Sequence, residues 1–324
     1  MVPTVRLCDG LHIETGRTVV CDARSSTGDV TVVSHAHADH VPRRNGTSVV
    51  CSALTAALVE ARTGVTLEYE TSASGVSLRP AGHVPGSRAA LIEGDRRVLY
   101  TGDVSTRDRG PRRGFEPVGA DVLVVEATYG RPDYRFPPQA VVEARVRDFV
   151  ADAAGPLVLF GYSLGRAQTL QRLVRETTAR RLVVHPQVHA ANRAIAAGTD
   201  RTFDATPWSA VDAIAPDDVV VAPTGARRDD WFAAQLDRLD PVTAAASGWA
   251  VHDGYRHRLG VDEAFVLSDH CDFDELVGLV RAVDPDRVYT HHGFADELAG
   301  HLAAEHGYDA VALERGQRRL EEFA

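Results

Sequence analysis

The sequence predicts an α/β protein of two domains, one of which is inserted into the other. The chain up to residue 135 consists of short apolar runs separated by Gly, Pro and Asp, which is typical of strands joined by turns. Residues 136–253 alternate helical and strand patterns, which indicates an α/β unit with a parallel sheet. Residues 254–324 return to strand–loop–helix units. We therefore expect residues 1–135 and 254–324 to form the outer domain and residues 136–253 the inserted one.

Apolar runs locate the strands of the first outer segment at residues 18–21, 30–34, 76–78, 89–92, 98–100 and 121–125. A helix is predicted over residues 52–62, with Ser52 as its N-cap. The elements predicted for the second outer segment are strands at 264–268 and 287–290 and helices at 272–283 and 297–305.

The inserted domain shows the alternation of helix and strand that is typical of an α/β unit with a parallel sheet. Its predicted elements are helices at residues 139–150 and 166–175 and strands at 157–160, 182–185 and 219–222.

The composition excludes several classes of function. The chain has 324 residues and a formal net charge of −10, and all 35 of its basic residues are Arg. Without Lys there can be no lysine Schiff base, pyridoxal phosphate enzyme, Walker lysine, Ser–Lys dyad or lysine-adenylating ligase. No run approaches the roughly 20 apolar residues of a membrane helix, and the start lacks the pattern of a secretory signal. The four Cys are scattered, so we predict a cytoplasmic protein that does not associate with a membrane.

The strongest chemical signal directly follows the strand predicted at residues 30–34. It reads Ser34-His35-Ala36-His37-Ala38-Asp39-His40. Imidazole and carboxylate groups are the donors that zinc and similar divalent ions prefer. Two adjacent ligand sets suit a pair of metal ions that clamp the attacking and leaving oxygens of a hydrolysis. Composition alone yields about 0.002 chance matches to this pattern, so a merely structural His-rich loop is disfavoured.

A metal pair needs further ligands from elsewhere in the chain. The candidates each follow an apolar strand at a turn that contains Gly: His83, Asp103, and one of the neighbours His291 and His292. Because neighbouring residues on a strand face opposite ways, only one of these last two can bind the metal. Ligands on both sides of the middle segment favour an insertion of residues 136–253 into one outer domain.

The order of these motifs resembles that of the metallo-beta-lactamase fold hydrolases. HAHADH is followed by AGHVPGS and then by YTGDVS. Residues 124–130, 267–270 and 291–293 are similar to the motifs of the beta-CASP nucleases. Within that group, residues 114–118, 161–168, 247–249 and 266–270 resemble the DNA-ligase-associated exonucleases and the archaeal mRNA 3′-end processing factor-like proteins. The resemblance implies an αββα sandwich that carries an inserted beta-CASP α/β domain.

The resemblance also implies roles for individual residues. Two Zn²⁺ ions, with Mn²⁺ as the alternative cation, would be bound by three groups of ligands: His35, His37 and His83 for the first ion, Asp39, His40 and His292 for the second, and Asp103 bridging both.

The remaining implied residues support the chemistry. Asp22 would orient a ligand His. His270 would protonate or stabilise the leaving oxygen, and Glu126 would hold its other ring nitrogen. Ser163 and Arg166, in a Gly-rich turn that opens a predicted helix, are candidates for substrate phosphate binding, as is Ser247.

The same Gly-rich turn offers a competing interpretation. Gly161, Ser163 and Gly165 match the GxSxG pattern of an esterase, in the required strand–turn–helix context. This pattern arises by chance about 0.1 times in such a composition, far more often than HAHADH. An esterase would also leave the His cluster unexplained.

The sequence therefore predicts a zinc-dependent phosphodiesterase, an exonuclease that hydrolyses DNA or RNA in DNA repair or RNA end processing. The alternative is a small-molecule metallo-hydrolase of lactonase or thioesterase type on the same two-metal core. Arg107, Arg109, Arg112 and Arg113 follow Asp103 and are candidates for contacts with a nucleic-acid backbone, although such runs are usually solvated. The resemblance implies a DNA ligase as a partner.

Overall fold

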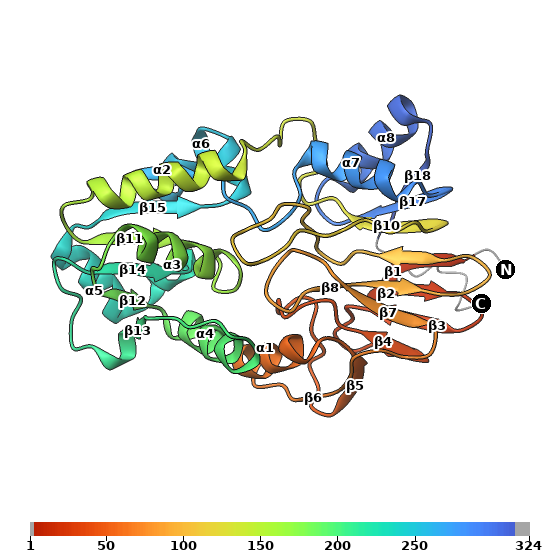
Figure 1. The fold of residues 1–324 in the computed structure, drawn as a ribbon, viewed down its shortest axis with the longest axis horizontal. Coiled ribbons are helices and arrows are strands. Elements are labelled where there is room, and N and C mark those ends of the chain that lie inside the picture. Colours follow the sequence, from red (N-terminus) through yellow and green to blue (C-terminus); the bar gives the residue numbers. More distant parts are fainter. Residues whose placement is uncertain (1–2, 315–324) are drawn as a thin grey trace, which may run out of the picture. The chain divides into compact units, whose positions relative to one another are not determined.

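The computed structural model describes residues 3–314, which fall into two compact units (Figure 1). The first unit comprises the chain up to residue 108, residues 112–132 and the chain from residue 270. The second unit comprises residues 109–111 and 133–269. The second unit extends beyond residue 253 because the strand at 263–265 pairs with the sheet of that unit.

The first unit contains two six-stranded sheets. Sheet one has the order β1-β2-β3-β4-β5-β6, with β1 Thr4–Cys8, β2 Gly10–Glu14, β3 Thr18–Cys21, β4 Val30–Val32, β5 Thr47–Val50 and β6 Leu67–Glu70. Sheet two has the order β18-β17-β10-β9-β8-β7, with β7 Val76–Pro80, β8 Arg88–Ile92, β9 Val98–Tyr100, β10 Val122–Glu126, β17 Arg287–His291 and β18 Asp309–Ala312.

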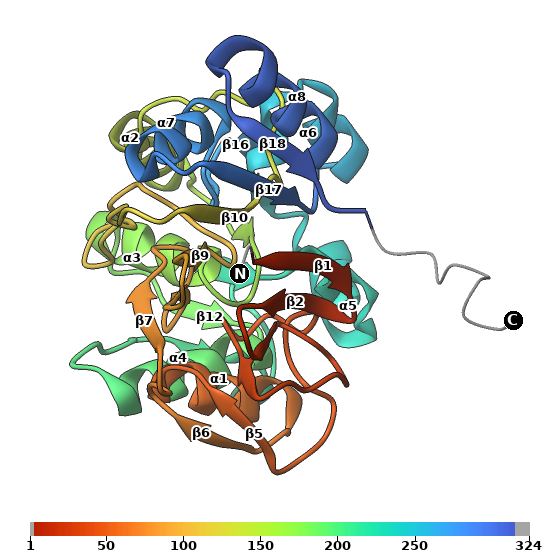
Figure 2. The same ribbon diagram turned by 90° about the vertical axis from the view of Figure 1, so that its right-hand side faces the viewer.

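Both faces of sheet two are buried. Ala90 and Ile92 of β8 pack in one core with Ile13 and Val19 of sheet one. Their neighbour Leu91 lies in a different core, which contains helices α7 (Phe273–Val283) and α8 (Ala295–His306). This alternation with a period of two explains why the strands of sheet two read as continuous apolar runs. Figure 2 shows α7 and α8 beside sheet two, and α1 (Ala53–Thr63) beside β5 and β6.

The second unit is built on a six-stranded parallel sheet with the order β13-β12-β14-β11-β15-β16. Its strands are β11 Leu157–Phe160, β12 Leu182–Val184, β13 Thr206–Pro207, β14 Val219–Ala222, β15 Val242–Ala246 and β16 Glu263–Phe265. Its helices are α2 Gln139–Asp152, α3 Arg166–Thr177, α4 Pro186–Gly198, α5 Asp230–Leu239 and α6 Gly254–Leu259, with short 3₁₀ turns at Trp208–Ala210, Thr224–Arg228 and Gly248–Val251.

Helices cover both faces of this parallel sheet. Val146 of α2 and Leu170 of α3 share a core with Leu159 of β11. On the opposite face, Phe232 of α5 shares a core with Phe160. A parallel sheet with two covered faces is what the alternation of helices and strands predicts, and the prediction of a parallel sheet is confirmed.

Candidate metal centre

The His35–His40 segment directly follows β4 and is held by a buried carboxylate. The backbone N–H of Ser34 donates to Asp22 Oδ1 at 2.7 Å, and its hydroxyl donates to Asp22 Oδ2 at 2.5 Å. On the other side of the segment, Arg62 Nε donates to the Ala36 carbonyl at 3.0 Å. The segment is therefore anchored both to the end of β3 and to α1.

Three imidazoles and one carboxylate converge in the first unit. The ring nitrogens His35 Nε2 and His37 Nδ1 are 3.0 Å apart, and His83 Nε2 is 3.3 Å from His37 Nδ1. Asp103 Oδ2 lies 3.4 Å from His35 Nε2 and 3.6 Å from His83 Nε2. One ligand atom from each of these four residues lies within 4.8 Å of all the others, so together they could hold a metal ion.

A second group lies beside the first. His40 Nε2 is 3.6 Å from Asp39 Oδ2 and 3.9 Å from Asp103 Oδ2. The rings of His40 and His292 are 5.8 Å apart, and Asp39, His40 and His292 line a common cavity of about 470 Å³. The Asp39 side chain is 75% exposed, whereas His40 is buried. The carboxylate of Asp103 thus approaches His residues of both groups.

Asp22 binds His40 as well as Ser34. Its Oδ2 accepts hydrogen bonds from His40 Nδ1 at 2.8 Å and from the Tyr100 hydroxyl at 2.6 Å. Burial and the neighbouring Asp22 raise the pKa of Tyr100 well above its usual value, so the phenol stays a donor. Asp22 has a φ of 53°, a left-handed conformation that Asp tolerates better than most residues.

These hydrogen bonds define which ring nitrogens are available. Since the Ser34 hydroxyl donates to Asp22, it accepts from His35 Nδ1 at 2.9 Å. His40 likewise donates from Nδ1 to Asp22. His35 is therefore a neutral tautomer whose Nε2 lone pair is available near Asp103, whereas His40 Nε2 can bind a cation only after its proton has left.

The His residues of the two metal groups differ in protonation at pH 7. Burial lowers the pKa of His35 well below its usual value and lowers that of His37 to about 3, so both rings are neutral at pH 7. Burial also opposes the charged form of His40, but Asp103 and Asp22 outweigh it and raise the pKa of His40 to about 10. Burial raises the pKa of Asp103.

The donor set fits a divalent metal ion. Neutral imidazoles and a carboxylate are the ligands of zinc and related ions. Ligands at zinc distances in a tetrahedral site lie about 3.3 Å apart, and the observed separations of 3.0–3.6 Å in the first group are close to this value. Several buried ring nitrogens lie within 3.3 Å of a neighbouring ring nitrogen and cannot all be satisfied by hydrogen bonds among themselves. A bound cation would satisfy them, because it accepts a lone pair from each.

Glycines let two ligand-bearing turns reach this position. Gly82 precedes His83 and has a φ of 71°, and a Cβ there would lie 2.1 Å from the Ser105 carbonyl oxygen. Gly102 precedes Asp103 with a φ of 56°, and a Cβ there would lie 2.7 Å from Ser34 Cβ. Neither position accepts a side chain without moving its neighbour.

A second buried pair lies next to the first group. His270 Nδ1 is 2.7 Å from Glu126 Oε1, and the rings of His270 and His83 are 4.4 Å apart. Glu126 also accepts backbone hydrogen bonds from Val104 at 2.9 Å and Thr128 at 3.3 Å. Burial opposes ionisation of Glu126, but His270 and these donors outweigh it and lower the pKa of Glu126. The charged carboxylate then accepts a hydrogen bond from the Nδ1–H of His270, so that His270 Nε2 is directed to other partners.

The neighbours His291 and His292 have different surroundings. His291 ends β17, is fully buried, and lies 5.8 Å from the Tyr100 ring. Neither of its ring nitrogens forms a hydrogen bond within residues 3–314. His292 turns away at a φ of 60° and lines the cavity with Asp39 and His40. The turn explains how adjacent residues reach opposite environments.

The predicted substrate-binding residues belong to the second unit, whereas the residues of the metal groups belong to the first. Arg166 is 3% exposed, and its Nε is 3.2 Å from Asp269 Oδ2. Ser247 is buried, and its hydroxyl accepts the Trp249 N–H at 3.3 Å. Ser163 is 7% exposed. In this structure the Arg166 guanidinium is engaged within its own unit.

The residues of the arginine run have partners within the protein. Arg107 Nη2 is 2.7 Å from Asp272 Oδ2, and Arg107 also pairs with Glu275 at the start of α7. Arg113 pairs with Asp108 at 2.7 Å on the surface. Arg109 is buried at 4% exposure. Arg107 thus fixes α7 rather than presenting a free cation.

Sequence reasoning overlooked the residues that support the ligands. Ser34 and Tyr100 bind Asp22, and Arg62 anchors the His-rich segment. Tyr100 lies two residues before Gly102 in the YTGD motif, so its place at the end of a strand beside Asp103 was the available signal. Arg62 carried no such signal, because its contact spans 26 residues of sequence.

The chain resembles known proteins over most of its length, although no family model matches it. A protein of Opitutus terrae named "Probable DNA ligase" is 39% identical over 306 residues, which cover 87% of this chain and 28% of that protein. The "Cleavage and polyadenylation specificity factor subunit 3" of Dictyostelium discoideum is 34% identical over 115 residues, which cover 34% of this chain and 14% of that protein. The chain therefore spans less than a third of the length of either relative.

A solved structure shows a similar fold. A protein of unknown function from Enterococcus faecalis V583 matches with a TM-score of 0.64 and 13% sequence identity, covering 97% of both chains. Further curated relatives are named as RNases. These similarities support the resemblance to the beta-CASP group of metallo-beta-lactamase-fold nucleases that the sequence motifs predict. Within residues 3–314, no helix combines the length and apolar character needed to cross a membrane.

Proposed function

We propose that this chain is a zinc-dependent nuclease that hydrolyses phosphodiester bonds as an exonuclease. The observation that carries the proposal is the position of Asp103 Oδ2, which lies 3.4, 3.6 and 3.9 Å from the Nε2 atoms of His35, His83 and His40. A single carboxylate oxygen close to both His groups suits a centre for two cations.

The two cations would be bound by residues of the first unit. The proposed ligands are His35, His37 and His83 for one ion, Asp39, His40 and His292 for the other, and Asp103 for both. Bound there, divalent cations would acidify a water molecule and neutralise charge on a phosphodiester. Asp22 would keep the His40 ring in place through its hydrogen bond to Nδ1.

His270 and Glu126 would manage the proton at the leaving group. Glu126 fixes the His270 ring through Nδ1, at 2.7 Å. The opposite nitrogen, Nε2, would then donate a proton to the leaving oxygen of the cleaved strand. A small, reactive substrate such as a lactone needs no such donor, which favours the nuclease over the lactonase or thioesterase alternative.

The proposed architecture is an αββα sandwich formed by the two sheets of the first unit, with the second unit as a beta-CASP-like insertion. The shared core between the two sheets supports the sandwich. We further propose a role in DNA repair or RNA end processing, with a DNA ligase as partner. A relative named as a DNA ligase supports this partner, since its matching segment covers 28% of that protein.

The proposal is tested with end-labelled single- and double-stranded DNA and RNA. The metal-loaded protein is expected to shorten at least one substrate progressively from one end, and a chelator should stop the reaction. Product lengths are resolved over time on denaturing gels. Internal cuts at early times would contradict the exonuclease assignment. The absence of cleavage of all four substrates by protein of verified metal content would contradict the nuclease itself.

Zinc binding is expected to strengthen with pH, because the proton on His40 must leave before Nε2 can bind a cation. Its pKa is raised from 6.5 to about 10 in the metal-free fold. Apparent affinity should therefore rise about tenfold per pH unit between pH 6.5 and 8.5. The stability of the metal-free fold changes with pH in the opposite direction. Because folding raises the pKa of His40, its protonation stabilises the fold fully below pH 6.5, and this stabilisation is lost as the pH rises through about 10.

Competition with a chromophoric chelator at three pH values measures this slope. The Asp22→Asn variant removes one carboxylate that holds the His40 proton, so its slope should be shallower. An affinity that does not change with pH would show that His40 binds no cation.

A further inference from the structure

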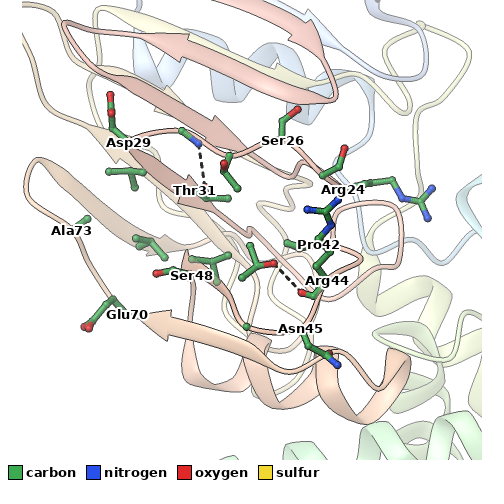
Figure 3. A pocket seen from close by; sticks show the side chains of 18 of the residues that line it. Arg24, Ser26, Asp29, Thr31, Pro42, Arg44, Asn45, Ser48, Glu70 and Ala73 are labelled. Atoms are coloured by element: carbon green, nitrogen blue, oxygen red, sulfur yellow. Dashed lines mark hydrogen bonds between the residues drawn. The ribbon is translucent and has the colours of Figure 1, made fainter.

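A polar cavity of about 580 Å³ opens in sheet one of the first unit, outside the metal groups (Figure 3). Its walls are two loop–strand segments, residues 24–31 and residues 42 and 44–50, together with residues 70, 72 and 73. β4 and β5 pair only at Val32 and Val50, while each strand pairs fully with its outer neighbour. The two strands therefore diverge toward their N-terminal ends, and the cavity lies where they separate.

One end of the cavity is rich in hydrogen-bond donors. Arg24 and Arg44 are exposed, and neither guanidinium has a hydrogen bond or ion pair within the described part of the chain. Asn45 Oδ1 accepts the Thr66 N–H at 3.0 Å, which leaves the Asn45 amide NH₂ as a donor. In Figure 3, Arg24, Arg44 and Asn45 lie together, whereas Asp29 and Glu70 lie toward the other side.

The loop that carries Arg24 is well fixed. Asp9 accepts the backbone N–H groups of Arg24 at 3.0 Å, of Ser25 at 2.8 Å and of Ser26 at 2.8 Å. Burial disfavours the charge of Asp9, but the Ser25 hydroxyl and these N–H groups outweigh it and hold its pKa below the usual range. A fixed loop loses little conformational freedom when Arg24 binds a ligand.

Arg24 connects this cavity with the proposed metal centre. It also lines the cavity of about 470 Å³ that contains Asp39, His40 and His292. Pro42 and Arg44, which line the larger cavity, follow His40 by two and four residues. The chain has a net charge of −10, so these exposed Arg side chains beside the proposed metal centre form a local region of positive charge. Such a region would attract the phosphates of a nucleic-acid strand.

We propose that the larger cavity is a nucleotide subsite for a single strand that continues from the metal centre, an inference that rests on the proposed nuclease function. Arg24 and Arg44 bind backbone phosphates, and the volume suits a nucleotide-sized ligand. The carboxylates of Asp29 and Glu70 repel a further phosphate, so that end takes sugar hydroxyls or base N–H groups.

Binding is measured without turnover, by fluorescence anisotropy of a labelled single-stranded 12-mer in the presence of chelator. Arg44→Ala and Arg24→Ala are each expected to weaken binding about tenfold. Each should also reduce the slope of log affinity against log salt by about 0.7, the value for one phosphate contact on a single strand. Melting temperatures verify that the variants fold.

Arg43→Ala is the matched control. Arg43 is exposed and adjacent to Arg44, its loss changes the net charge equally, and it does not line the cavity. Its affinity and salt slope should match the wild type. Equal effects of Arg43→Ala and Arg44→Ala, or no binding by the wild type at low salt, would overturn the subsite.

Cleavage assays separate this inference from the proposed function. We expect the KM for a cleaved oligonucleotide to rise about tenfold in Arg44→Ala and to stay unchanged in Arg43→Ala. This result would support the subsite. Cleavage with the same KM in both variants overturns the subsite and leaves the nuclease proposal standing. A failure of the metal-loaded wild type to cleave any strand overturns the nuclease proposal itself.

Discussion

Replacing Asp103 by Ala is expected to lower nuclease activity on the order of 10³-fold and to reduce the bound metal. Its carboxylate lies within 3.4–3.9 Å of the Nε2 atoms of His35, His83 and His40. Without it, a cation would lose the one negatively charged ligand placed between both His groups. The measurements are metal content by mass spectrometry and initial rates on the best oligonucleotide substrate.

Two further variants make this result interpretable. Asp103→Asn keeps the shape of the buried side chain and removes its charge, so it should lose metal nearly as strongly while folding normally. Asp200→Ala, at an exposed site of the second unit, should leave metal content and rate unchanged. Full metal content and full activity in Asp103→Ala would refute the assignment of this residue as a ligand.

The apolar pattern of the chain predicts the buried elements well. The helix with Ser52 as N-cap is confirmed, since the Ser52 hydroxyl accepts the Thr55 N–H at 3.0 Å. The helix predicted at 272–283 is confirmed as α7, which begins with a capping box at Asp272. Strands β3, β9, β11 and β14 begin and end as predicted. Such elements are specified locally, by capping groups and by uninterrupted apolar runs.

Several of the overlooked elements have a sequence that carries a mixed signal. β1 and β2 alternate buried residues with partly or fully exposed ones over only five positions each, so their apolar runs are interrupted. β15 consists of Val242-Thr243 and three Ala, and Ala favours helices over strands. It forms a strand because it pairs with both β11 and β16. Tertiary pairing of this kind is invisible in a local pattern.

The candidate site likewise combines residues that a local motif reveals with residues that only tertiary contacts bring together. His35, His37 and His40 are visible as a motif because they lie within six residues. The hydrogen bond from Tyr100 to Asp22 spans 78 residues, and that from His270 to Glu126 spans 144. Residue type and a neighbouring Gly in the sequence identify such residues as candidates, but their contacts with one another follow only from the fold.

Replacing Arg166 by Ala is expected to destabilise the second unit by roughly 3–5 kcal/mol. The side chains of Arg166 and Asp269 are each 3% exposed and form an ion pair at 3.2 Å. Arg166 also donates to the Ala246 carbonyl at 3.3 Å. Truncation would leave the Asp269 carboxylate buried without this partner, and the cost of such a charge exceeds the value of the pair itself.

Urea unfolding followed by tryptophan fluorescence measures this loss in the relevant unit. Trp208, Trp231 and Trp249 are the three tryptophans of the chain, and all belong to the second unit. The control is Arg193→Ala on α4 of the same unit, because Arg193 is exposed. A substitution at an exposed site of this kind changes stability by about 0.5 kcal/mol or less, so this variant should unfold close to the wild type.

The double variant Arg166→Met with Asp269→Leu separates structure from substrate binding. If the pair acts structurally, removing both charges should recover stability relative to Arg166→Ala, because no unpaired charge stays buried. If Arg166 instead binds a substrate phosphate, Arg166→Ala should raise KM and leave the urea midpoint unchanged. Since Asp269 directly precedes His270, we expect loss of the pair to lower kcat as well, through displacement of His270, the proposed proton donor.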